Sequence, residues 1–110
     1  DEGEIALLEP KIVSEAERKE QRRLAAERRQ SVAPLRKAAT EAEAWVNRMT
    51  KQLAGVREKL ADPRLYEGPV EAVRQTQMEL GRAEAALASA EADWLAAQEK
   101  LEAATQDAVA

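Results

Sequence analysis

The sequence lacks the residues on which most catalytic and metal sites depend. It contains no cysteine and no histidine, which excludes disulfides, thiol nucleophiles, imidazole bases and the usual zinc sites. It also has no phenylalanine, and only 3% of its 110 residues are aromatic, so a deep globular core is not expected. We predict no catalytic residue, no metal ligand and no cofactor for this chain.

Long hydrophobic runs are missing as well. No apolar stretch approaches the roughly 18 residues that cross a bilayer, and the acidic start, residues 1–4, lacks the basic region of a signal peptide. We therefore expect a cytoplasmic, soluble protein with no membrane partner. Because the chain begins without methionine and shows no catalytic apparatus, we also expect it to be a piece of a longer protein.

Glycine and proline, four of each, are few and unevenly placed in a sequence rich in Ala, Glu, Leu, Arg, Gln and Lys, a mixture that favours long helices. Asp62-Pro63 and Gly68-Pro69 are the clearest breaks. They predict an all-α fold, an antiparallel two-helix coiled-coil hairpin over residues 14–110, with arms at about 14–61 and 70–106 and a tip from Asp62 to Gly68. Residues 1–13 are expected to form a linker or a loosely docked lead.

Apolar residues repeat at steps of three and four along both arms, which is the spacing of a coiled-coil seam. On the second arm the large residues alternate with Thr76, Ala83, Ala90, Ala97 and Ala104. The predicted seam residues of the first arm are Leu35, Ala39, Ala42, Val46, Met49, Leu53, Val56 and Leu60. The large seam residues of the second arm are Val73, Leu80, Leu87, Trp94 and Leu101.

Pro34 allows two arrangements of the first arm. It either kinks one long helix or begins a new one, because proline suits a first turn and disrupts a helix interior.

Folding the chain at its tip midpoint, between Leu65 and Tyr66, pairs residues whose numbers add to about 131. That register places Trp94 opposite Arg36 to Ala39, where small side chains leave room for the indole.

The two arms carry opposite charge. Residues 18–59 hold twelve Lys or Arg against five Glu, a net of +7, whereas residues 62–110 hold ten acids against four bases, a net of −6. A basic stripe of this kind can track a phosphate backbone without reading sequence. The candidate nucleic-acid-binding residues are Arg18, Lys19, Arg22, Arg23, Arg29, Arg36 and Lys37. The competing interpretation is a solvated helix face that pairs with the acidic arm.

Three segments, 33–37, 58–66 with its Asp-Pro-Arg-Leu-Tyr run, and 92–99 with Trp94, resemble the C-terminal extension of bacterial ABC-F ATPases. The likeness is nearest to the YheS type, with the Uup type more distant, and covers about residues 19–104. ABC-F proteins are soluble, carry two ATPase cassettes and act on ribosomes. Their C-terminal extension is an antiparallel coiled coil that binds DNA or ribosomal RNA according to subgroup.

The resemblance implies a non-catalytic domain whose parent binds ATP and Mg and has the ribosome as a partner. The chain has no phosphate loop, no signature motif and no acidic strand end for Mg²⁺, so no ATPase residue is carried over and this chain itself is not expected to be an enzyme. We expect a monomer that contacts ribosomal RNA or another nucleic acid. The alternative is a purely structural or protein-binding coiled coil, such as a dimerisation or docking arm.

Overall fold

The computed structural model describes residues 12–109, so most of the lead predicted for residues 1–13 lies outside the described residues. Helix α2 spans Glu15–Ala61, the short 3₁₀ helix η1 spans Pro63–Glu67, and α3 spans Val70–Val109. No strand occurs in this part of the chain. The chain divides into two units at Ser31 and Val32, and each is described by itself.

Within the first unit, α2 begins with a side-chain cap. The Ser14 hydroxyl accepts a hydrogen bond from the Glu17 backbone N–H at 3.2 Å, and the Ser14 carbonyl accepts the Arg18 N–H at 2.9 Å. The first bond pairs an N–H that would otherwise be free in the first helical turn, and the second is the first regular backbone bond of the helix. Glu15 and Glu17 also place negative charge at the positive end of the helix dipole.

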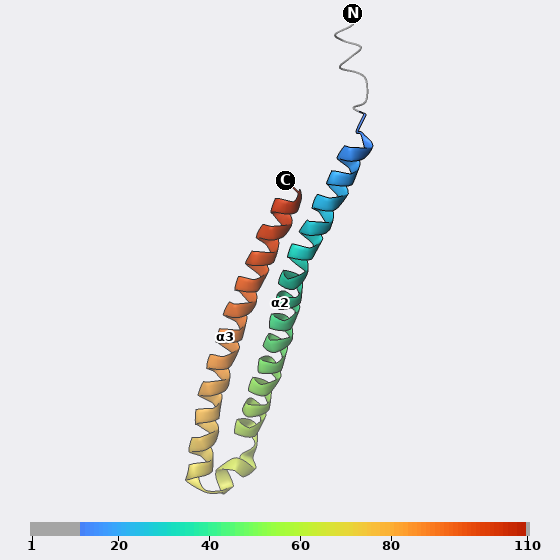
Figure 1. Cartoon of the computed structure of the whole chain (residues 1–110). Helices are drawn as coiled ribbons and strands as arrows, with labels where there is room; N and C mark the ends of the chain where they lie inside the picture. Colours follow the sequence, from blue (N-terminus) through green and yellow to red (C-terminus); the bar gives the residue numbers. More distant parts are fainter. Residues whose placement is uncertain (1–11, 110) are drawn as a thin grey trace, which may run out of the picture. The chain divides into compact units, whose positions relative to one another are not determined.

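The second unit, residues 32–109, is an antiparallel hairpin of α2 and α3 with η1 at its tip (Figure 1), which confirms the predicted all-α hairpin. Leu53, Val56 and Ala83 form a buried cluster, against which the partly buried residues Leu60, Leu80 and Leu87 pack. Ala90 and Ala83 are 1% and 4% exposed, so these two small residues of α3 lie deep in the seam. Close approach at these positions lets the large side chains interdigitate.

Helix α2 runs through Pro34 without a break, so the alternative in which a new helix begins at Pro34 is wrong. Proline has no N–H and therefore cannot donate to the carbonyl of Gln30, one turn earlier. Val32 and Ala39, on either side of Pro34, are both buried. Packing of the seam across this point compensates the missing hydrogen bond and keeps the backbone helical.

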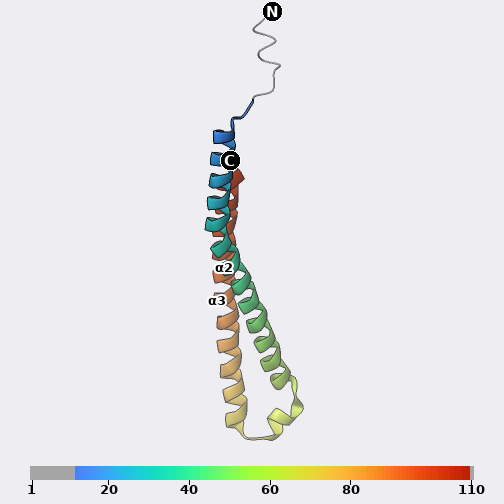
Figure 2. The ribbon, with the colours of Figure 1, turned by 45° about the vertical axis from the view of Figure 1, so that its right-hand side comes forward.

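The tip is an ordered turn rather than an open loop. Asp62 caps η1, because its Oδ1 accepts the Arg64 backbone N–H at 3.0 Å. The Arg64 guanidinium also donates to both Asp62 oxygens, with Nη2 to Oδ2 at 2.8 Å. The Tyr66 hydroxyl donates to the Leu60 carbonyl at 2.6 Å, which ties η1 to the last turn of α2. The turned view in Figure 2 shows η1 between the end of α2 and the start of α3.

The pairing register differs from the predicted one. Lys59 Nζ lies 3.4 Å from Glu79 Oε2, and Leu53 and Val56 pack with Ala83, so facing residues have numbers that add to about 138, not about 131. Trp94 is therefore level with about residue 44, and the prediction that it faces Arg36 to Ala39 is wrong. The prediction took the tip as a symmetric turn, whereas η1 packs against the start of α3, and the first two turns of α3 pass the end of α2.

Candidate nucleic-acid interface

Four of the predicted phosphate-binding residues, Arg18, Lys19, Arg22 and Arg29, lie on α2 in the unit that ends at Ser31, and all four are exposed. In an α-helix, steps of four and seven bring side chains to nearly the same face, so Arg18, Arg22 and Arg29 form a row. None of the ion pairs between described residues includes any of the four. Their charge is directed to solvent.

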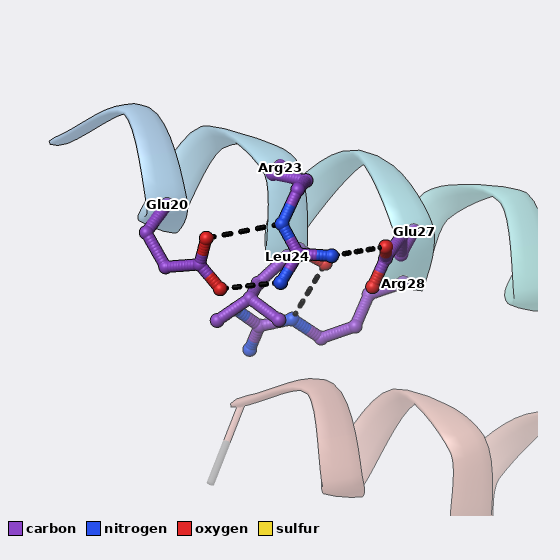
Figure 3. Close-up of polar contacts among 5 residues, drawn as sticks. All are labelled: Glu20, Arg23, Leu24, Glu27 and Arg28. Atoms are coloured by element: carbon purple, nitrogen blue, oxygen red, sulfur yellow. Dashed lines mark hydrogen bonds and ion pairs between the residues drawn. The ribbon is translucent and has the colours of Figure 1, made fainter. Parts of the chain in front are cut away.

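Arg23, also predicted as a phosphate contact, forms ion pairs with two glutamates of its own helix (Figure 3). Its guanidinium pairs with Glu20 one turn earlier and with Glu27 one turn later, the latter at 2.6 Å. The hydrogen bond from Arg23 lowers the pKa of Glu20 below its usual value, and both glutamates raise the pKa of Arg23 further. Arg23 thus stays charged but is neutralised locally.

Arg28 bonds to its own helix in the same view (Figure 3): its Nε donates to the Leu24 carbonyl at 3.3 Å.

The remaining two candidates, Arg36 and Lys37, lie in the hairpin unit and are exposed. Lys37 Nζ is 4.0 Å from Glu41 Oε1, a loose pair at helical spacing, and Arg36 takes part in no ion pair between described residues. Of the seven candidate cations, Arg23 and Lys37 therefore form ion pairs. The other five, Arg18, Lys19, Arg22, Arg29 and Arg36, form none with described residues.

Few ion pairs join the two helices within the hairpin unit, residues 32–109. Within residues 32–109, Lys59 with Glu79 is the one ion pair that joins α2 to α3; the others link neighbours within one helix or within the tip. Within these residues, the opposite charges of α2 and α3 therefore do not form a ladder of cross-helix bridges.

The predicted seam residues are all buried or partly buried. Ala39, Met49, Leu53 and Val56 are the buried members. The partly buried members are Leu35, Ala42, Val46, Leu60, Val73, Leu80, Leu87, Trp94 and Leu101. Trp94 has a buried Nε1 with no hydrogen-bond partner among the described residues, a feature that seam periodicity alone does not predict.

The aromatic side chains all lie in the hairpin unit, and none lies within residues 15–31. Trp45 is 44% exposed, and the Arg48 guanidinium lies 5.0 Å from its ring centroid, a cation–π contact. Tyr66 is exposed but has its hydroxyl bonded at the tip. An interface at residues 15–31 would thus contact phosphates rather than stack on bases.

Within residues 12–109, no group of acidic side chains is placed to hold a metal ion. In the same range, none of the helices has both the length and the apolar character that a bilayer crossing requires.

Comparison of the chain with family models, curated proteins and solved structures found no match.

Sequence reasoning missed the glutamates that decide which cations are available. Glu20 lies three residues before Arg23 and Glu27 four residues after it, which are the two spacings that place side chains side by side on a helix. Checking every arginine against acids in both directions finds this pair. The same check detects no such acid around Arg29 and only Glu15, at three residues, around Arg18.

Proposed function

We propose that this chain is a non-catalytic coiled-coil domain of a cytoplasmic ABC-F ATPase and that it contacts nucleic acid, in the context of the ribosome, through residues 15–31. The observation that carries the proposal is the row of exposed cations, Arg18, Lys19, Arg22 and Arg29, which lack ion pairs with described residues. Phosphates are the partners that such a row can neutralise with release of counterions.

The local chemistry supports phosphate contact of low sequence specificity. Arginine and lysine on a helix face bind phosphate oxygens, which have the same form at every base. The stretch has no exposed aromatic side chain for stacking, which disfavours recognition of unpaired bases. The partner class is thus the sugar–phosphate backbone of RNA or DNA, with ribosomal RNA the expected form in the parent protein.

Alanine at these four positions tests the proposal. The quadruple variant Arg18→Ala, Lys19→Ala, Arg22→Ala, Arg29→Ala should bind a labelled RNA hairpin or DNA duplex at least tenfold more weakly at low salt, because four phosphate contacts are lost. Circular dichroism should show that the helix persists, since alanine has the highest helix propensity.

A matched control carries the same loss of charge elsewhere. Lys51, Arg57, Arg82 and Lys100 are exposed and have no ion pair with described residues. The control variant Lys51→Ala, Arg57→Ala, Arg82→Ala, Lys100→Ala should retain most of the affinity. Equal losses in both variants would mean that net charge alone matters, and unchanged binding in the first would remove the interface altogether.

A structural or protein-binding coiled coil is the second candidate, and the exposed apolar side chains favour it. Trp45, Tyr66 and Leu95 are 44%, 57% and 54% exposed, and aromatic residues are enriched at protein interfaces. An obligate dimer in sedimentation equilibrium, together with poor nucleic-acid binding, would select this candidate. A monomer that binds RNA or DNA would select the first, and two ATPase cassettes in the parent reading frame would establish the ABC-F assignment.

A further inference from the structure

We propose that the hairpin of residues 32–109 has a second register, in which α3 is displaced along α2 by one heptad. In the structure, facing residues have numbers that add to 138; in the second register they add to 131. Seven residues correspond to about 10 Å at 1.5 Å per residue. The inference concerns the coiled coil itself and does not depend on what residues 15–31 bind.

The seam keeps its large and small alternation after a seven-residue shift. Leu80 takes the place of Leu87, and Ala83 takes the place of Ala90, because both helices repeat their apolar residues every seven positions. A displacement by one heptad keeps each seam position of α2 opposite a seam position of the same kind on α3.

The length of paired helix is also preserved. In the observed register, residues 32–61 of α2 face residues 77–106 of α3, and in the second register they would face residues 70–99. Both stretches lie wholly within α3, which spans Val70–Val109. The two turns of α3 that now pass the end of α2 and contact η1 supply the extra length.

Few contacts distinguish the two registers. The one ion pair that joins the helices within residues 32–109, Lys59 with Glu79, has both side chains largely exposed, at 63% and 45%, and exposed pairs contribute little. The contact of η1 with α3 also belongs to the observed register. The observed register also leaves the Trp94 Nε1 buried without a partner among the described residues, which is a cost to that register.

Disulfide trapping tests the second register directly, since the chain has no native cysteine. The variant Ala38→Cys with Lys100→Cys reports the observed register, and Ala38→Cys with Asp93→Cys reports the displaced one. Ala38→Cys with Asp107→Cys is the matched control, because it reports the opposite shift. All four positions are exposed, and none belongs to the Lys59 pair or to η1.

Under mild oxidation, the first two variants should close intramolecular disulfides, and the control variant should not. Lys59→Ala should raise the disulfide yield of the displaced-register variant by up to about fivefold, because it removes the ion pair that favours the observed register. Mass spectrometry distinguishes these products from dimers. A yield in the displaced-register variant no higher than that of the control, with and without Lys59→Ala, would overturn the proposal.

Discussion

Individual side chains decide how the tip and the seam are built. Asp62 accepts hydrogen bonds from the Arg64 side chain and backbone, and these bonds hold its pKa below the usual value. Trp94 illustrates the opposite case, because it fills the seam but leaves its N–H without a partner among the described residues. One residue thus stabilises its surroundings through polar contacts, and the other through apolar area alone.

The Asp62 cap should make the tip sensitive to acid. Its pKa is lower in the folded chain than in the unfolded chain, so its contribution is fully present above the unfolded value and is lost as the pH falls through the folded value. We expect η1 to loosen below about pH 4, which the backbone amide NMR signals of residues 64–67 would detect in both the unaltered chain and an Asp62 variant. Asp62→Ala should remove the transition; the same transition in that variant would contradict the assignment.

Replacing Trp94 should separate the indole's apolar contribution from its N–H. Trp94→Phe removes the unpaired donor and keeps an aromatic ring, so the free energy of unfolding should change by less than about 1 kcal/mol. Trp94→Ala loses the packing and should cost about 2 to 4 kcal/mol. Urea denaturation measures both, and an equal loss in the two variants would show that the N–H has a partner.

At the scale of the element, both long helices contain residues that weaken helices. Gly55 and Gly81 lie in the interiors of α2 and α3, and a Cβ added at either would meet nothing within 4 Å. Pro34 is embedded in α2. The helices persist because tertiary packing on a long seam outweighs local propensity.

Alanine at the two glycines should stabilise the hairpin. Gly55→Ala and Gly81→Ala each reduce the backbone freedom of the unfolded chain without creating a clash, and each should add about 1 kcal/mol to the free energy of unfolding. Thermal and urea unfolding monitored by circular dichroism would measure the gain. A loss of stability in either variant would reveal a close neighbour that the structure does not contain.

Pro34→Ala should strengthen α2 around residues 30–34. The variant restores an N–H that can donate to the Gln30 carbonyl, so we expect about 1 to 3 kcal/mol of added helix stability. Hydrogen exchange should slow for amides near residues 30–34 if this bond forms. Unchanged exchange there would indicate that the backbone at Pro34 is already as ordered as the rest of the helix.

For the whole molecule, the sequence predicted the helices, the seam and the tip, because each depends on local spacing and on the placement of proline. It did not predict the register, since Lys59 with Glu79 and the packing of η1 on α3 arise only in three dimensions. It predicted the basic face, but net charge alone does not show which cations remain available; that depends on Glu20 and Glu27, whose helical spacing pairs them with Arg23. The resemblance to ABC-F extensions stays a prediction.

The salt dependence of binding tests the central claim, that Arg18, Lys19, Arg22 and Arg29 neutralise phosphates. For a duplex, each phosphate contact contributes about 0.9 to the slope of log Kd against log salt concentration. Relative to the unaltered chain, the quadruple alanine variant should lower that slope by about 3 to 4, whereas the control variant at Lys51, Arg57, Arg82 and Lys100 should leave it unchanged. An unaltered slope in the quadruple variant would contradict the account.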